Sequence, residues 1–219
     1  MSANINLPWA AAISEGMKQG IDRHWRYSKE MLKVKPEYLL TVFVAERLAW
    51  GAGEQSGYDL SIKLEESTHN IVGRIWFNQI GHKGYFRENF SWPGRRGRVD
   101  IYVEHELTKE ARIIELKNFD PSSTELSKEL KRFVNFFGIN DYSNHLRGCY
   151  LAFPTLDDRK SWIQELANKW GNDQLKITVN TRHSLTGTDP EDGIPEYWLN
   201  VVSYENLIHE HRLQTKFSH

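Results

Sequence analysis

The sequence predicts a mixed α/β protein built around one central β-sheet flanked by helices. Three observations predict this class: segments with apolar residues at helical spacing, short segments with apolar residues spaced as in strands, and the order in which these segments follow one another. Helices come first, then an antiparallel hairpin, and then helices alternating with strands. No internal repeat or obvious linker divides the 219 residues, so we expect one domain over residues 1–219.

The chain opens with two predicted helices. Residues 8–26 form the first, because five apolar residues recur there at helical spacing: Trp9, Ile13, Met17, Ile21 and Trp25. Residues 37–50 form the second, which Gly51 and Gly53 end. Residues 58–64 alternate between apolar and polar and predict a strand, with a short helix as the alternative. Residues 71–77 fit either a strand or the end of a helix, and residues 78–97, rich in Gly, aromatic residues and Arg, predict a loop.

Two apolar segments, residues 98–103 and 111–117, predict the arms of a β-hairpin with a polar turn between them. A symmetric hairpin pairs Asp100 with Glu115. Side chains two apart on a strand share a face, so Glu115 and Lys117 point the same way. Like charges directly opposed destabilise a sheet, so the two carboxylates suggest a bound cation, and Mg²⁺ prefers such oxygen ligands.

The second half of the chain alternates between helices and strands. Ser122 precedes Glu125 at the spacing of a capping box, which predicts a helix to about Phe137 that Gly138 ends. The remaining predicted elements follow in order: a strand over 148–153, a helix from Asp157, a strand over 175–179, a loop over 181–195, a strand over 197–202 and a weakly docked tail after about residue 209.

Composition and charge narrow the class of function. The formal net charge is -1, so contact with a polyanion must come from local basic clusters and bound metal. No segment approaches the roughly 18 to 20 apolar residues of a membrane span, and the first residues lack the pattern of a signal peptide, so we expect a cytoplasmic protein with no membrane partner. The sequence has no phosphate loop of the Gly-x-x-x-x-Gly-Lys type, which leaves nucleotide hydrolysis without support.

Asp100 followed by Glu115-x-Lys117, then by a helix and a strand, resembles the PD-(D/E)XK nuclease superfamily. Val99 stands in place of the name-giving proline, a position that supplies backbone rather than a ligand. The resemblance covers roughly residues 37–155, so residues 1–30 would be an N-terminal helical extension and residues 180–219 a C-terminal one. It implies a restriction-endonuclease-like fold with helices on both faces of a central mixed sheet, a Mg²⁺ or Mn²⁺ ion, and hydrolysis of phosphodiester bonds.

The superfamily often supplies another carboxylate from a helix ahead of the hairpin, and Glu46 would be that residue here. Positions 39, 42, 43, 46, 49 and 50 share one helical face, on which Glu46 is the only charge. A carboxylate in a buried stripe needs a cation or several hydrogen bonds. We therefore expect Glu46 to join Asp100 and Glu115 at a metal site; the alternative is a salt bridge to a core arginine or a position at the water's edge.

The segment before the hairpin interleaves aromatic rings with guanidinium groups, a composition suited to phosphate contact and base stacking. We expect Trp92, Arg95, Arg96 and Arg98 to contact substrate; alternatively, the rings anchor a loop on the core and the arginines are solvated. On the helix that follows the hairpin, Lys128, Lys131 and Arg132 predict a solvated face, with a basic rim for substrate as the alternative.

The prediction for function is a Mg²⁺-dependent endonuclease that acts on nucleic acid, with DNA favoured over RNA by the superfamily resemblance. Asp100, Glu115 and Glu46 would bind the metal, and Lys117 would stabilise the attacking water or the developing charge. A homodimer is expected if both strands of a duplex are cut. The alternative is a catalytically silent nuclease-like module that binds nucleic acid or a protein partner.

Overall fold

The computed structural model describes residues 8–28, 37–56, 60–80, 97–139, 145–185 and 196–207. In these residues six strands form one mixed sheet in the order β1-β2-β3-β4-β6-β5, in which only β3 and β4 are parallel neighbours. The strands are β1 (Leu60–Ser67), β2 (Arg98–His105), β3 (Ala111–Leu116), β4 (Leu146–Thr155), β5 (Leu175–Leu185) and β6 (Glu196–Asn206). The helices are α1 (Trp9–Ser28), α2 (Glu37–Ser56), α3 (Thr68–Ile80), α4 (Ser123–Ile139) and α5 (Lys160–Trp170).

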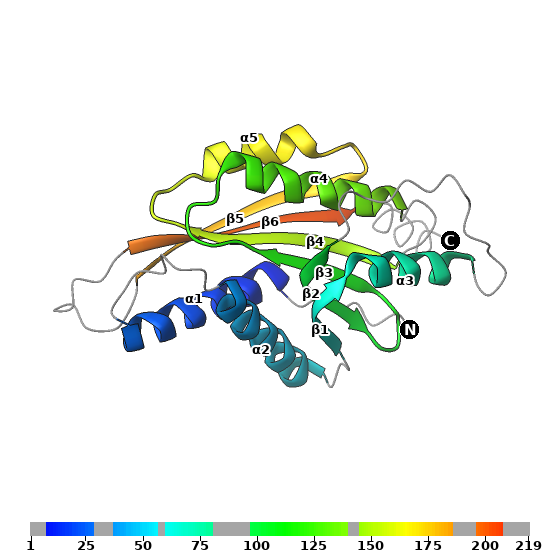
Figure 1. Ribbon diagram of the computed structural model, residues 1–219, viewed down its shortest axis with the longest axis horizontal. Coiled ribbons are helices and arrows are strands. Elements are labelled where there is room, and N and C mark those ends of the chain that lie inside the picture. The colour runs from blue at the N-terminus through cyan, green and yellow to red at the C-terminus, as the bar shows by residue number, and fades with distance from the viewer. Residues whose placement is uncertain are drawn as a thin grey trace, which may run out of the picture.

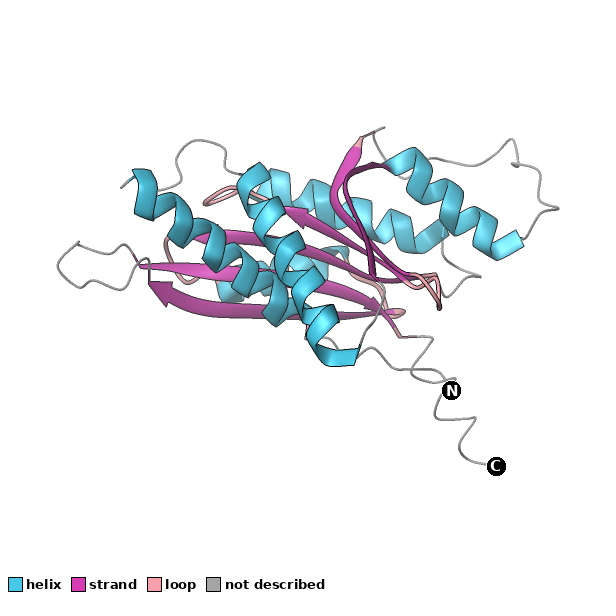
Figure 2. Cartoon of the chain, turned by 90° about the horizontal axis from the view of Figure 1, so that it is seen from below, coloured by secondary structure: helices cyan, strands magenta, loops and turns pink. Residues whose placement is uncertain are grey.

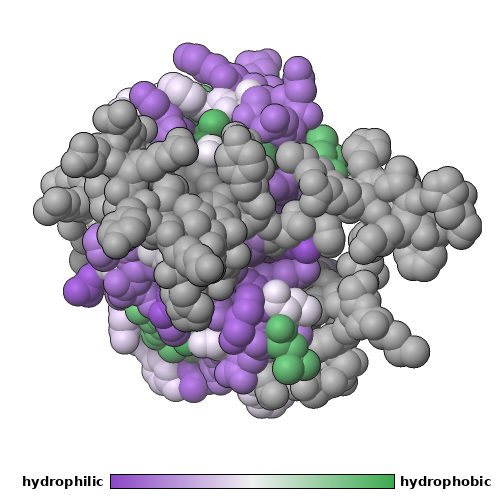
Figure 3. Space-filling view, turned by 90° about the vertical axis from the view of Figure 1, so that its right-hand side faces the viewer, coloured by the Kyte–Doolittle hydropathy of each residue, from purple (hydrophilic) through white to green (hydrophobic). Residues whose placement is uncertain are grey.

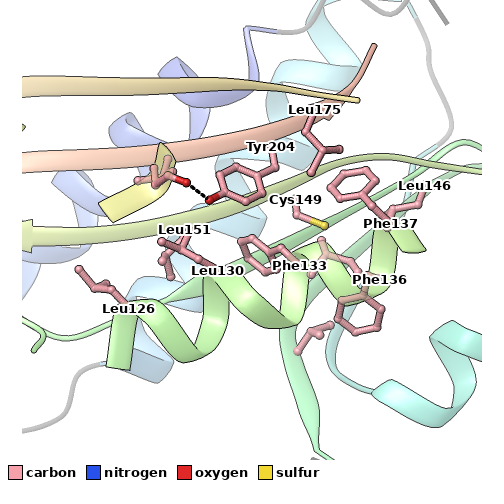
Figure 4. Close-up of a cluster of buried hydrophobic side chains, with 14 of the residues drawn as sticks. Leu126, Leu130, Phe133, Phe136, Phe137, Leu146, Cys149, Leu151, Leu175 and Tyr204 are labelled. Atoms are coloured by element: carbon pink, nitrogen blue, oxygen red, sulfur yellow. Dashed lines mark hydrogen bonds between the residues drawn. The ribbon is translucent and has the colours of Figure 1, made fainter. Parts of the chain in front are cut away.

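Helices cover both faces of the sheet, which confirms the predicted α/β class (Figure 1). α4 and α5 lie on one face, and their apolar side chains share a core with the strands below them. Figure 4 shows how Leu126, Leu130 and Phe133 of α4 point at the sheet, while the Tyr204 hydroxyl donates a hydrogen bond to the Ala167 carbonyl of α5. This packing fixes the rotation of α4 above β3 and β4.

The second core lies on the opposite face, between the sheet and α1 and α2 (Figure 2). α1 buries Trp9, Ile13, Met17 and Ile21, as its predicted spacing requires. The two helices approach closely at Gly16, where an added Cβ would lie 2.6 Å from the Cα of Val44. A side chain at that position would therefore force two backbones apart.

The observed elements correct several predicted boundaries. Of the two alternatives for residues 71–77, the structure shows the helix, since these residues belong to α3. α2 continues through Gly51 and Gly53 to Ser56, since glycine in a helix interior has only a modest cost. β5 runs to Leu185, so residues 181–185 are strand where a loop was expected; they pair with β6 despite their polar side chains. Residues 186–195 and the tail after 207 lie outside the described residues.

The described parts of the two predicted extensions, α1 at the N-terminal side and the end of β5 with β6 at the C-terminal side, belong to the same sheet and core. α1 packs against the face formed by β3, β4 and β6, and β6 is an internal strand between β4 and β5. Among the described helices, none combines the length and apolarity that crossing a bilayer requires. Seen from the side on which α3 lies, the described surface is mostly hydrophilic with small, separate hydrophobic areas (Figure 3).

Candidate functional site

The β2–β3 hairpin has the predicted register. Ile101 pairs with Ile114 and Glu104 with Ala111, so continuing the same register sets Asp100 opposite Glu115. The Asp100 carboxylate interrupts the ladder there: its Oδ2 accepts a hydrogen bond of 2.7 Å from the Leu116 N–H. On the other side of β2, Glu65 stands at the position of β1 opposite Asp100 and has a φ of 54°, a left-handed conformation that costs strain in a non-glycine residue.

Glu115 is a buried carboxylate held between two cations. It is 2 % exposed. Its Oε1 forms an ion pair with the Arg132 guanidinium, and its Oε2 lies 3.7 Å from the Lys117 Nζ. Because an ionised carboxylate has about four lone-pair sites on its two oxygens, these contacts leave it room for a further cationic partner.

Lys117 follows β3 directly and contacts helices from both faces of the sheet. Its N–H donates to the Ala152 carbonyl of β4 at 2.9 Å, which fixes its backbone. Its Nζ lies 3.3 Å from Glu37 of α2 and 3.5 Å from Glu129 of α4. Burial by itself would lower the pKa of Lys117, but the carboxylates of Glu129, Glu37 and Asp100 outweigh it and raise that pKa above its usual value. The lysine is therefore held as a cation.

The surroundings of Asp100 disfavour its ionised form, in contrast to those of Lys117. Burial raises its pKa to about 6, although the Leu116 N–H and the charge of Lys117 both lower it, and the charges of Glu37 and Glu65 raise it further. Desolvation thus outweighs the stabilisation that the Leu116 N–H and Lys117 give to the ionised form, and a cation bound beside Asp100 would favour that form.

The predicted role of Glu46 rests on a helical face that is not the buried one. Glu46 is exposed, and α2 buries Leu40, Thr41, Val44 and Leu48 instead. Thr41 can be buried because its Oγ1 donates a hydrogen bond of 2.8 Å to the Glu37 carbonyl within the helix. The expectation of a buried Glu46 was thus wrong. The carboxylate that α2 brings to Lys117 is Glu37, in its first turn.

Arg132 is another residue whose burial differs from the prediction. A solvated side chain was expected, yet only 13 % of it is exposed and it contacts Glu115 and Glu129, while Lys128 and Lys131 are exposed as predicted. Of the expected substrate contacts, Arg98 is exposed at the start of β2. Trp92, Arg95 and Arg96 lie outside the described residues.

A cavity of about 220 Å³ opens beside the site. It lies where β3 ends and α4 begins, and nine residues line it: Glu37, Lys117, Asn118, Phe119, Asp120, Pro121, Glu125, Lys128 and Glu129. Three of them, Glu37, Lys117 and Glu129, are also in contact with one another through the Lys117 ammonium. A ligand in this cavity could therefore reach the Lys117 ammonium.

The donor types at the site suit a hard divalent cation. Six buried or half-buried charged side chains converge there, four acidic and two basic, which gives a formal charge of -2 with the carboxylates ionised: Glu37, Asp100, Glu115, Glu129, Lys117 and Arg132. Within the described ranges no group of three or more His, Cys, Asp or Glu side chains is arranged to hold a metal ion. Mg²⁺, however, is commonly held by one or two carboxylates with water and substrate oxygens, a requirement that Asp100 and Glu115 meet by donor type.

Comparisons of the chain with protein-family models, with curated proteins and with solved structures found no match.

Proposed function

We propose that this protein is a Mg²⁺-dependent nuclease that hydrolyses phosphodiester bonds, with DNA as its substrate class. The observation that carries the proposal is the meeting of Asp100, Glu115 and Lys117 at one end of the central sheet. The hairpin register sets the two carboxylates opposite one another, and the Lys117 Nζ lies 3.7 Å from Glu115. This is the set of side chains that the Asp100, Glu115-x-Lys117 pattern requires of a PD-(D/E)XK nuclease.

The topology around the hairpin supports the same proposal. β3 is followed by α4 and then by β4, which lies parallel to β3, and helices cover both faces of the mixed sheet. A restriction-endonuclease-like fold is expected to have a mixed sheet covered in this way. We therefore extend the α/β class to that fold as part of the proposal.

Each residue of the site has a separate task in this reaction. Asp100 and Glu115 would hold the cation, since the register of β2 and β3 sets them opposite one another. Lys117, kept charged by its acidic neighbours, would stabilise the attacking water or the charge that develops on the phosphate. A bound Mg²⁺ would polarise the scissile phosphate and lower the pKa of a bound water.

Plasmid cleavage by the purified chain tests this proposal. We expect supercoiled DNA to be nicked or linearised with Mg²⁺ or Mn²⁺ and to stay intact with EDTA. Asp100→Asn and Lys117→Met should each lower the cleavage rate by at least about 100-fold, because each removes a group that acts on the transition state. A rate that neither substitution changes would rule out the proposed site.

The second candidate is a catalytically silent module that binds nucleic acid or a protein. It is favoured by one observation: both oxygens of Glu115 already contact cations, Arg132 and Lys117, so that carboxylate is compensated by the chain itself. Calorimetric titration with Mn²⁺ separates the two candidates. The nuclease should bind Mn²⁺ and lose this binding in Asp100→Asn, whereas the silent module should give the same heats with both proteins.

A further inference from the structure

Four charged side chains at the site form a closed ring of alternating charge. The Lys117 Nζ lies 3.5 Å from Glu129 Oε1, and Glu129 Oε2 lies 3.2 Å from Arg132 Nε. Arg132 forms an ion pair with Glu115 Oε1, and Glu115 Oε2 lies 3.7 Å from the Lys117 Nζ, which closes the ring. Two of these residues come from the hairpin and two from one turn of α4.

The four side chains of the ring are buried, and burial of this kind argues that the ring does not serve stability alone. Exposed fractions of its side chains range from 3 % for Glu115 to 17 % for Lys117. Burying charges costs desolvation energy, and well-packed apolar side chains in place of a buried ion pair are often as stable or more so. Stability alone therefore does not explain why these four charges are buried together.

The positions of Glu129 and Arg132 on α4 indicate a role other than stability. Glu129 and Arg132 each directly precede a residue that packs on the sheet, Leu130 and Phe133. Their side chains therefore lie on the flank of α4 next to its apolar face, anchored by that packing. Arg132 Nη1 also donates a hydrogen bond of 3.5 Å to the Arg98 carbonyl, which ties α4 to the start of β2.

We propose that Glu129 and Arg132 are positioning residues for phosphodiester hydrolysis: Glu129 fixes the Lys117 ammonium, and Arg132 fixes the Glu115 carboxylate. The inference rests on the proposed nuclease function and adds two residues outside the Asp100, Glu115-x-Lys117 pattern. Lys117 has a long flexible stem with four rotatable bonds. A rigid partner on a packed helix restricts that freedom before substrate arrives, as efficient catalysis requires.

The test is the double variant Glu129→Met with Arg132→Met. It removes one negative and one positive charge, so the net charge of the site and its long-range attraction for DNA are unchanged. We expect the melting temperature to equal or exceed that of the wild type. We expect kcat for DNA cleavage to fall about 10- to 100-fold with KM within about twofold, because the reacting groups lose their alignment. A crystal structure of the variant should show displaced Lys117 and Glu115 side chains.

The control is Lys18→Met with Asp22→Met, which removes an ion pair of two residues four apart on α1. This control should keep the wild-type kcat. Glu129→Asp provides a variant with less risk to folding, since it keeps the charge and withdraws the carboxylate by one methylene; it should also lower kcat without raising KM.

Three outcomes overturn the inference: an unchanged kcat in the folded double variant, an unchanged kcat in Glu129→Asp, or Lys117 and Glu115 side chains that keep their positions in the double variant. The proposed nuclease function fails separately, if the wild type neither cleaves DNA nor binds Mn²⁺. The crystallographic comparison needs no activity, so it decides whether Glu129 and Arg132 position these side chains even in that case.

Discussion

Asp100 lies at the centre of the site, and its ionised form is costly in the folded protein because the carboxylate is largely buried. Its pKa of about 6 lies above the ordinary value of 3.8, so the folded state binds more protons than the unfolded state between these two values. Stability therefore falls as pH rises from about 4 to about 6, and the cost persists at higher pH. A cation bound beside Asp100 would remove part of that cost.

Asp100→Asn should accordingly make the protein more stable and less active. Asparagine keeps an oxygen that can accept the hydrogen bond from the Leu116 N–H, but it carries no charge to desolvate. At pH 8 we expect the free energy of unfolding to rise by roughly 1 to 3 kcal/mol, and at pH 3.5 to change little. Urea denaturation at both pH values measures this, with the exposed Asp173→Asn as the matched control. A destabilised Asp100→Asn at pH 8 would contradict the electrostatic account.

At the scale of elements, α2 provides a direct contrast between two carboxylates. Glu37 Oε1 lies 3.3 Å from the Lys117 Nζ, whereas Glu46 is exposed. We expect Glu37→Gln to lower DNA cleavage about 3- to 10-fold because the ammonium loses one of its anchors. We expect Glu46→Gln to have the smaller effect. The free energy of unfolding of both variants should lie within about 1 kcal/mol of the wild-type value, because the ion pair of Glu37 is half-exposed and Glu46 is exposed. A larger loss of activity in Glu46→Gln than in Glu37→Gln would contradict the assignment of Glu37 as the carboxylate of α2 that acts on Lys117.

The α1–α2 contact supports a prediction about stability alone. Gly16→Ala places a Cβ 2.6 Å from the Val44 Cα and 2.8 Å from the Phe43 carbonyl oxygen, and both are backbone atoms that cannot rotate away. We expect a loss of about 1 to 3 kcal/mol in chemical denaturation. Gly73→Ala in α3 is the matched control: no atom lies within 4 Å of the added Cβ, so it should stabilise by up to about 1 kcal/mol. Equal effects of the two would refute close packing at Gly16.

The elements that sequence predicts well are those whose pattern is local. The hairpin register follows from counting outward from a polar turn between two apolar arms, and the spacing of α1 identifies its buried face. α2 is apolar around most of its circumference, so its buried face depends on where α1 lies. β5 continues into the polar residues 181–185 because β6 supplies backbone partners. Glu129 and Arg132 look like ordinary helix-surface residues; only the rotation of α4 over β3 brings them to Glu115 and Lys117.

At the scale of the whole molecule, the formal charge of -1 limits how the proposed DNA substrate could be bound. A nearly neutral protein gains little from its overall field, so attraction for a polyanion must come from a few basic side chains. The six-residue cluster at the site is itself net negative. The basic residues that remain close to Asp100 in the sequence are Arg95, Arg96 and Arg98, the expected substrate contacts.

Arg95→Ala with Arg96→Ala should therefore weaken DNA binding in a way that depends on salt. Each phosphate contact contributes about -0.9 to the slope of log K against log salt, so the loss of two contacts should reduce the slope by about 2. Fluorescence anisotropy with a DNA duplex in Ca²⁺ buffer, between about 50 and 200 mM salt, measures this slope. Lys169→Ala with Lys176→Ala, two exposed lysines at the end of α5 and the start of β5, removes the same charge away from the site and is the control. If both double variants reduce the slope equally, binding depends on total charge, and the segment before β2 has no special role in holding the substrate.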